Sequence, residues 1–305
     1  MSRNAKETRH PENGTPQAVS VVIPVYNECG AVVETIREVN RALEPTGREF
    51  EIIIADDGSS DGSAEAIGRS GLDVTLVRHP VNRGYGAALK SGFARARHGL
   101  IAFLDADGTY SPTDLPALLT AAEGADMVVG VRAHYDLHAS LARRLGKAIL
   151  LPLANYTAGC KIPDLNSGMR VVRRELIERY WPLLPDGFSL TTTLTMSFLS
   201  AGRQIEWVPI PYAERKGRSK IRPLRDMRTF VLLILRTATY FKPLKVYLPV
   251  SAVFVVASIA VTILSKMLGG QVMDVTALFL FIAGLQILLI GVLADLVLKI
   301  LGTRR

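Results

Sequence analysis

Cysteine is scarce in this sequence of 305 residues, which contains only Cys29 and Cys160. Two cysteines without the spacing of metal ligands argue against a disulfide framework and a zinc site, and they are compatible with a reducing cytoplasm. Histidine is also sparse, and the histidines do not stand at ligand spacing from carboxylates. We therefore assign no chemistry to His79, His98, His134 or His138.

Residues 1–17 lack the apolar core of a secretory signal peptide. They are polar and contain Pro11, Gly14 and Pro16, so we expect a disordered tail over this stretch. We find no internal repeat in the remainder of the chain.

Acidic residues are too few to balance the basic ones, and the formal net charge is +8. The basic residues gather at residues 143–147 and along residues 215–245. Such clusters suit nucleic acid, phospholipid headgroups or a phosphorylated substrate. Because the second cluster runs directly into an apolar segment, we favour membrane lipid over nucleic acid as the partner.

Strands alternate with helices through the first two thirds of the chain. This alternation predicts an α/β domain with a mostly parallel sheet, whose ligands bind beyond the carboxyl ends of the strands. The hydrophobic pattern predicts strands over residues 19–25, 50–55, 74–77, 100–104, 127–131, 168–172 and 205–210. It predicts helices over residues 31–43, 61–67, 86–97, 141–157 and 190–200.

An amphipathic segment follows over residues 222–241, within a boundary that we place at 221–244. Leu224, Met227, Phe230 and Ile234 share one side of the predicted helix, and arginines lie among the other positions. A basic helix with an aliphatic face can lie in the headgroup layer of a membrane. The alternative is an ordinary surface helix packed on the domain.

Two long apolar segments close the chain, at residues 246–265 and 275–294. Each is long enough to cross a bilayer as a helix, so residues 245–301 predict a two-span transmembrane hairpin. The basic residues at its outer ends place the preceding α/β domain and both termini in the cytoplasm by the positive-inside rule. Short two-span anchors often assemble, so a homo-oligomer is a further expected partner. The flanking basic residues are Lys242, Lys245, Lys299, Arg304 and Arg305.

Two aspartates, Asp105 and Asp107, directly follow a predicted buried strand with one residue between them. A turn at a strand end can bring both carboxylates to one divalent ion, and oxygen ligands suit Mg²⁺ or Mn²⁺ on a diphosphate. A solvated turn is the alternative for this pair alone.

Three further polar stretches stand where other strands end. They read Ile-Pro-Val-Tyr-Asn-Glu at 23–28, Ala-Asp-Asp-Gly-Ser at 55–59 and Asn-Arg-Gly-Tyr-Gly-Ala-Ala at 82–88. Because the carboxyl ends of parallel strands meet at one edge of a sheet, these stretches and the aspartate pair predict a single site.

This set of motifs resembles the GT-A domain of family 2 glycosyltransferases, in particular the polyprenyl (dolichyl) phosphate mannose and glucose synthases. The resemblance covers residues 19–220, and it implies a GT-A catalytic domain over 18–220. It implies that Pro24, Tyr26, Glu28 and Asp56 surround the base and ribose of a nucleotide sugar. The implied nucleotide-sugar site also includes Asp57, Gly84, Lys90, Asp105 and Ala106, and the implied ligands of Mg²⁺ or Mn²⁺ are Asp105 and Asp107.

Two later segments extend the resemblance. Residues 166–170 match the family's Ser-Gly-Phe-Arg element with Met169 in place of phenylalanine, and residues 215–220 match its basic loop near the acceptor phosphate. One departure is Thr109, where many relatives carry glutamine. The shorter side chain of threonine argues against a metal contact there.

The expected reaction brings two polyanionic substrates together, the donor diphosphate and the acceptor phosphate. A phosphate monoester is largely dianionic near neutral pH and needs no strong general base, so we expect a phosphate oxygen to attack the anomeric carbon directly, with inversion. Asp107 is the expected catalytic metal ligand, and the candidates for binding the acceptor phosphate are Arg132, Arg170, Arg218 and Lys220. Neither the sugar nor the choice between UDP and GDP can be read from the sequence.

Other functions remain open at this stage. A different lipid or glycan acceptor is compatible with the same motifs. A processive polysaccharide synthase would need its Gln-x-x-Arg-Trp signature, which is absent, and two spans cannot form a translocation channel. A non-catalytic membrane scaffold would be favoured by loss of a metal aspartate, but both are present. A nucleotidyltransferase would carry a glycine-rich Arg-Leu start, which is not found near Val19.

Overall fold

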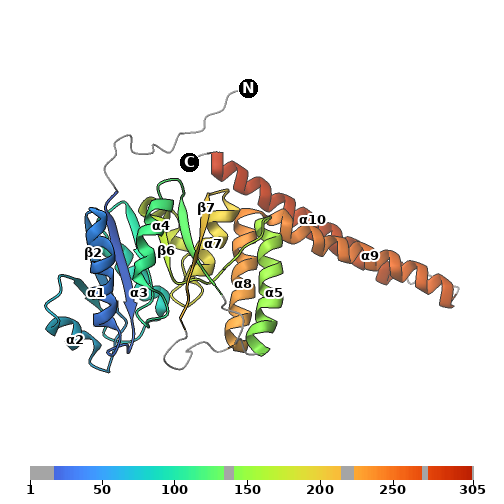
Figure 1. Cartoon of the computed structure of the whole chain (residues 1–305). Helices are drawn as coiled ribbons and strands as arrows, with labels where there is room; N and C mark the ends of the chain where they lie inside the picture. Colours follow the sequence, from blue (N-terminus) through green and yellow to red (C-terminus); the bar gives the residue numbers. More distant parts are fainter. Residues whose placement is uncertain (1–16, 134–140, 214–222, 270–273, 304–305) are drawn as a thin grey trace.

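The computed structural model describes residues 17–133, 141–213, 223–269 and 274–303. Its centre is one seven-stranded sheet in the order β3-β2-β1-β4-β6-β5-β7 (Figure 1). The strands are β1 (Val19–Val25), β2 (Phe50–Asp56), β3 (Thr75–Arg78), β4 (Leu100–Phe103), β5 (Met127–Arg132), β6 (Arg170–Arg173) and β7 (Ile205–Ile210).

The sheet is mostly parallel, as the sequence predicts. β1 pairs in parallel with β2 and β4, β2 with β3, and β5 with β7, whereas β6 runs antiparallel between β4 and β5. The carboxyl ends of β1, β2, β3 and β4 therefore lie at one edge of the sheet, where the predicted motifs stand.

Helices cover both faces of the sheet (Figure 1). One core contains apolar residues of α1 (Val32–Leu43), α2 (Ser63–Arg69) and α4 (Leu115–Ala121). The other contains residues of α3 (Tyr85–Arg95), α6 (Arg174–Tyr180) and α7 (Leu190–Ser200). β1 is buried along its whole length, because Val21 and Ile23 face the first core and Val22 faces the second. The pattern did not predict α4 and α6, each of which has only seven residues.

Two longer helices lie beside the sheet domain, next to α7. α5 (Leu141–Ala158) and α8 (Pro223–Phe241) pack together, and Ile234 of α8 is fully buried in a small core with Ala154 and Met196. Over residues 231–241 the amphipathic helix is thus packed on the domain, which corrects the expectation that Ile234 faces lipid. Its other side exposes Leu232 and Tyr240.

The chain ends in a helical hairpin that projects away from the sheet (Figure 1). α9 (Pro243–Gly269) and α10 (Asp274–Thr303) contain the apolar stretches Pro243–Met267 and Val275–Ile300, both long and apolar enough to cross a membrane. The hydroxyl groups of Ser251 and Ser258 donate hydrogen bonds of 2.7 Å to the carbonyl oxygens of Gly284 and Ala277. These bonds fix the register of the two antiparallel helices.

Candidate active site

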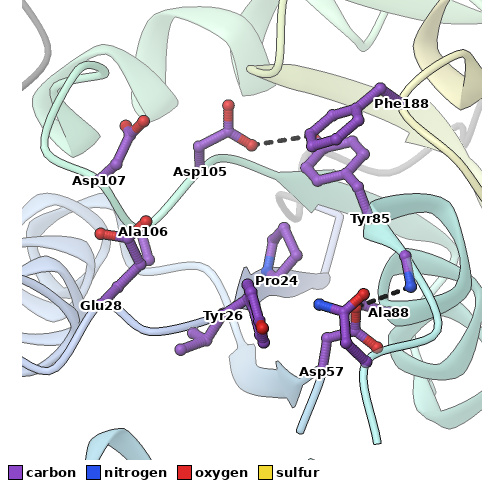
Figure 2. A pocket seen from close by; sticks show the side chains of 13 residues that line it. Pro24, Tyr26, Glu28, Asp57, Tyr85, Ala88, Asp105, Ala106, Asp107 and Phe188 are labelled. Carbon is purple, nitrogen blue, oxygen red and sulfur yellow. Dashed lines mark hydrogen bonds between the residues drawn. The ribbon is translucent and has the colours of Figure 1, made fainter. Parts of the chain in front are cut away.

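A cavity of about 520 Å³ opens at the carboxyl ends of β1, β2 and β4 (Figure 2). Most of its lining comes from the predicted motifs, which the fold brings together from distant parts of the chain. The lining residues are Pro24, Val25, Tyr26, Glu28, Asp57, Asn82, Gly84, Tyr85, Ala88, Asp105, Ala106, Asp107 and Phe188.

The loop after β1 is held by the loop after β2. Asn27 has a positive φ of 54°, a left-handed conformation that asparagine tolerates better than most residues. Its backbone N–H donates to Oγ of Ser59 at 2.9 Å, and its side-chain oxygen accepts from the N–H of Ser60 at 2.9 Å. These bonds place Tyr26 and Glu28, on either side of Asn27, at the wall of the cavity.

The Asp105 carboxylate lies between Tyr85 and Gly168, which are both distant from it in the sequence. The Tyr85 hydroxyl donates a hydrogen bond of 2.8 Å to its Oδ1, and the Tyr85 ring stacks on Phe188 with centroids 5.5 Å apart. Burial raises the pKa of Tyr85 well above its usual value, and the charge of Asp105 raises it further. The hydroxyl therefore stays protonated as a donor. A Cβ on Gly168 would stand 2.5 Å from Oδ2 of Asp105, so a side chain there would displace the carboxylate.

Asp107 is oriented within its own turn. Oδ1 of Asp107 accepts the hydroxyl of Thr109 at 2.6 Å and the N–H of Thr109 at 3.1 Å. Thr109, which the sequence comparison marked as a departure from its relatives, thus contacts the aspartate. Figure 2 shows Asp107, Asp105 and Glu28 along one edge of the cavity.

The turn after β4 also contacts the chain that enters the basic segment. The N–H of Ala213 donates to the carbonyl of Thr109 at 3.0 Å, and the ring of Tyr212 packs edge-on against Tyr110 at 5.2 Å. Arg218 and Lys220 lie outside the described residues, and Ala213 is the last described residue before them in the sequence.

Asp57 organises the loop before α3. Its Oδ1 and Oδ2 accept the N–H groups of Arg83 and Gly84, each at 2.8 Å. His79, to which the sequence assigned no chemistry, hydrogen-bonds Asp57 through Nδ1 at 2.7 Å and Ser91 through Nε2 at 2.8 Å. The histidine is buried and touches Asp57 rather than the cavity, so it positions the aspartate.

A second segment closes over the start of α3. The N–H of Ala87 donates to the carbonyl of Asp186 at 3.0 Å, and a Cβ on Gly84 would stand only 2.6 Å from that oxygen. Nζ of Lys90 lies 2.5 Å from a carboxylate oxygen of Asp186. This segment carries Phe188, which no sequence motif singled out.

The predicted site residues divide into three groups. Those brought together at the cavity are Pro24, Tyr26, Glu28, Asp57, Gly84, Asp105, Ala106 and Asp107. Those not in its lining are Asp56, Lys90, Arg132 and Arg170. Arg218 and Lys220 lie outside the described residues.

Asp56 and Lys90 instead hold neighbouring loops. The Asp56 carboxylate is fully buried, accepts the N–H of Ser59 at 3.0 Å and lies 3.2 Å from Nε of Arg78. The expectation that Asp56 surrounds the base and ribose is therefore corrected, because its carboxylate is enclosed by protein. Lys90 is likewise engaged by Asp186 and by the carbonyl of Leu184.

Arg170 is enclosed in the second half of the sheet. Its side chain is fully buried and donates to the carbonyls of Ser167 and Leu165 and to the hydroxyl of Thr195, at 2.7 to 3.0 Å. Desolvation lowers its pKa to about 10. The expectation that Arg170 binds the acceptor phosphate is corrected, because the guanidinium faces carbonyl groups inside the fold.

Arg132 forms a bidentate ion pair with Asp164. Nε and a terminal nitrogen of Arg132 lie 2.7 and 2.8 Å from the two carboxylate oxygens, and the guanidinium stands 5.3 Å above the ring of Tyr212. Burial alone would raise the pKa of Asp164, but the bonds and charge of Arg132 lower it below its usual value. Contact of Arg132 with the acceptor stays a prediction.

A divalent metal fits the carboxylates at the cavity only if other ligands complete its shell. In the described part of the chain, no group of three or more His, Cys, Asp or Glu residues is placed to hold an ion. Two aspartates with oxygen donors, facing an open cavity, suit Mg²⁺ or Mn²⁺ whose remaining ligands are substrate phosphate and water.

Comparison with known families identifies the chain. The profile of glycosyl transferase family 2 matches residues 20–181, and the profile of the GtrB C-terminal hairpin matches residues 242–300. The undecaprenyl-phosphate 4-deoxy-4-formamido-L-arabinose transferase of Salmonella paratyphi B is 33% identical over 293 residues, which cover 91% of this chain and 87% of that protein. The chain belongs to glycosyltransferase family 2.

Solved structures agree with this assignment at the level of the fold. Glucosyl-3-phosphoglycerate synthase from Mycobacterium tuberculosis, crystallised with Mn²⁺, UDP and phosphoglyceric acid, aligns with a TM-score of 0.58 at 23% identity, over 73% of this chain and 78% of that one. Mannosyl-3-phosphoglycerate synthase from Rubrobacter xylanophilus aligns with a TM-score of 0.55 at 21% identity, over 73% of each chain. The glycosyltransferase therefore has the GT-A fold that its motifs indicate.

Proposed function

We propose that this family 2 glycosyltransferase moves a sugar from a nucleotide diphosphate sugar to polyprenyl phosphate at the cytoplasmic face of a membrane, with inversion at the anomeric carbon. The observation that carries the proposal is the joining, in one chain, of an acidic cavity at the sheet edge to a helical pair with membrane-spanning length. The name of the Salmonella relative, an undecaprenyl-phosphate sugar transferase, supports the choice of acceptor.

In this proposal Asp105 and Asp107 hold Mg²⁺ or Mn²⁺. When bound, the cation would neutralise the donor diphosphate and stabilise it as a leaving group. Tyr85 orients Asp105 through its hydrogen bond, and Thr109 orients Asp107 in the same way. Tyr26, Glu28 and Asp57 line the same cavity, where we propose that the nucleotide sugar binds.

The acceptor is proposed to approach from the side of the basic segment. Residues 215–220 begin just after Ala213, whose N–H bonds the carbonyl of Thr109 in the aspartate turn. Arg218 and Lys220 are therefore the proposed partners of the acceptor phosphate, in preference to the enclosed Arg170. A dianionic phosphate attacks without transferring a proton to the protein, so no general base is required of the chain.

The reaction is tested with purified full-length protein in detergent. The donors are UDP- and GDP-linked hexoses, N-acetylhexosamines and 4-deoxy-4-formamido-arabinose, and the acceptor is polyprenyl phosphate with either cation. We expect one donor class to give a glycosyl phosphopolyprenol of opposite anomeric configuration. Transfer to a free glycan or protein in place of polyprenyl phosphate, or retained configuration, would overturn the respective part of the proposal.

Asp107→Asn tests the metal site without altering the fold. The variant removes one negative oxygen ligand without changing shape, so transfer should be lost while thermal unfolding stays unchanged. Asp73→Asn changes an exposed carboxylate far from the cavity and serves as the matched control. Activity of Asp107→Asn within a few-fold of wild type at saturating Mg²⁺ or Mn²⁺ would rule out the assignment.

The proposed orientation places the catalytic domain in the cytoplasm. Cys29 and Cys160 are both exposed on this domain, so they report its side of the membrane. A membrane-impermeant thiol reagent should label them in inverted vesicles and spare them in sealed vesicles of native orientation. The opposite labelling pattern would reverse the orientation.

A further inference from the structure

Phe188 is an exposed aromatic side chain within the candidate active site. It lines the cavity and is 43% exposed, whereas the other phenylalanines of residues 19–210 are buried or half-buried. One face of its ring is stacked on the ring of Tyr85, with the two ring planes 13° apart. An apolar ring that stays in contact with water costs free energy, and a ligand that covers the ring removes that cost.

The segment that carries Phe188 is tied to α3 at two points. Nζ of Lys90 lies 2.5 Å from a carboxylate oxygen of Asp186. A Cβ on Gly86 would stand 2.3 Å from the carbonyl oxygen of Pro185, so the two backbones are in direct contact there. A ring on such a support loses little conformational freedom when a ligand covers it, which favours binding.

Phe188 also lies close to Asp105, a proposed metal ligand. The Tyr85 hydroxyl is 2.8 Å from Oδ1 of Asp105, and the centroids of the Tyr85 and Phe188 rings are 5.5 Å apart. Figure 2 shows Asp105 and Phe188 at the upper end of the cavity and Tyr26 and Asp57 at its lower end.

The covalent order of a nucleotide sugar fits this arrangement. The diphosphate joins the nucleoside on one side to the sugar on the other. When a metal ion held by Asp105 binds the diphosphate and the nucleoside lies at Tyr26, as the family resemblance implies, the sugar reaches the end of the cavity where Phe188 stands.

We propose that the ring of Phe188 stacks against the sugar of the donor and binds the face of the sugar on which C–H bonds gather. A pyranose ring carries much of its hydroxyl surface around its edge, and the C–H groups on its faces are apolar. The face of an aromatic ring is weakly negative and attracts such hydrogens. This inference rests on the proposed function and assigns Phe188 to binding of the sugar rather than to the transfer step.

The affinities for nucleotide sugar and for nucleoside diphosphate separate this contact from others. Calorimetry with full-length protein in detergent and saturating Mn²⁺ uses the nucleotide sugar of the panel above that wild type binds most tightly, and then the matching UDP or GDP. Phe188→Leu keeps an apolar side chain and removes the flat ring. We expect its affinity for the nucleotide sugar to fall about two- to tenfold, with its affinity for UDP or GDP unchanged.

Two further variants serve as controls. Phe188→Tyr keeps the flat ring and should retain the wild-type affinity for both ligands. Phe281→Leu makes the same replacement at a phenylalanine of α10 that is 48% exposed, on the hairpin that projects away from the sheet. It should leave both affinities unchanged.

Two results would overturn the stacking. An equal loss of affinity of Phe188→Leu for nucleotide sugar and nucleoside diphosphate would mean that Phe188 acts on the base, or through Tyr85 on the metal site. Unchanged affinity for both would mean that the ring does not contact the donor, and a raised KM for polyprenyl phosphate would then assign it to the acceptor.

Failure of the proposed function gives a different result. A wild-type chain that binds no nucleotide sugar overturns both proposals. A chain that binds nucleotide sugar but does not transfer it to polyprenyl phosphate overturns the proposed function alone, and the ratio of the two affinities in Phe188→Leu still decides the stacking.

Discussion

The hydroxyl of Tyr85 and Oδ1 of Asp105 are 2.8 Å apart, and this bond joins the first turn of α3 to the turn after β4. Gly168, which has no side chain, stands at the other carboxylate oxygen. The carboxylate of Asp105, a proposed metal ligand, is therefore held between the Tyr85 hydroxyl and the backbone of Gly168. Stacking of the Tyr85 ring on Phe188 fixes the donor itself.

Tyr85→Phe should weaken metal binding while preserving the fold. The substitution keeps the stacked ring and removes the hydroxyl that orients Asp105. Loss of one hydrogen bond to a charged group corresponds to about 1.5 kcal/mol, which is on the order of tenfold in affinity. Calorimetric titration of each protein with Mn²⁺ in the presence of UDP or GDP measures the affinity for metal directly.

The control for this prediction is Tyr240→Phe, which removes an exposed hydroxyl on α8. It should leave the affinity for metal and nucleotide unchanged. Equal affinities for Tyr85→Phe and wild type would show that Asp105 needs no such support.

Thr109→Val should reduce turnover without abolishing it. Valine keeps the shape of threonine but cannot donate to Oδ1 of Asp107, while the N–H of residue 109 still can. We expect about a five- to tenfold lower kcat, since one of two orienting bonds is lost. Thr113→Val, which removes an exposed hydroxyl bonded only to Ser111, is the matched control. A larger effect of the control than of Thr109→Val would contradict this role.

Much of the fold could be predicted because β1, α7 and β7 follow simple rules. β1 is a continuous buried apolar run between polar turns, and the structure gives it the predicted bounds, Val19–Val25. α4 and α6 were not predicted; each has seven residues, about two turns, which show little of the helical period, although α2 has the same length and was predicted. The antiparallel direction of β6 was also not predicted, since direction depends on the path of the chain rather than on local pattern.

The site could be predicted only where it follows a strand end. Glu28, Asp57, Asp105 and Asp107 all stand there, and all reach the cavity. Phe188 arrives from a loop more than eighty residues further along the chain, so no local pattern could place it beside Tyr85. The basic character of Arg170 suggested a phosphate contact, but only the packing around it shows that its donors are taken up by buried carbonyls.

Arg170→Lys should lower stability more than it affects acceptor binding. Lysine keeps a charge but cannot donate in three fixed directions, so buried carbonyl groups lose partners. We expect the free energy of unfolding to fall by about 2 to 4 kcal/mol, measured by thermal unfolding in detergent. Arg174→Lys, which changes an exposed pair with Glu178, should change it by less than about 1 kcal/mol. An unchanged unfolding curve together with a raised KM for acceptor would instead support a contact between Arg170 and the acceptor.

The last prediction concerns where the catalytic domain ends. A chain that ends near Arg222 would lack α8 and leave its binding surface on α5 and α7 uncovered, whereas one that ends after Lys242 keeps Ile234 in its small core. The ring of Phe241 also packs edge-on against Tyr180 at 6.0 Å, which ties the end of α8 to the sheet domain. We therefore expect residues 1–242 to fold and bind nucleotide with metal.

Transfer to long-chain polyprenyl phosphate should still fall steeply in the 1–242 variant, because the hairpin that is proposed to hold it at the membrane is gone. The 1–222 variant should aggregate or unfold at lower temperature, since exposed apolar surface promotes association. Thermal unfolding, nucleotide calorimetry and acceptor kinetics on both variants test these expectations. Equal stability of the two would mean that α8 contributes little to the domain and binds chiefly to the membrane surface. Full activity of 1–242 on membrane-embedded acceptor would show that the hairpin serves another purpose, such as assembly of a homo-oligomer.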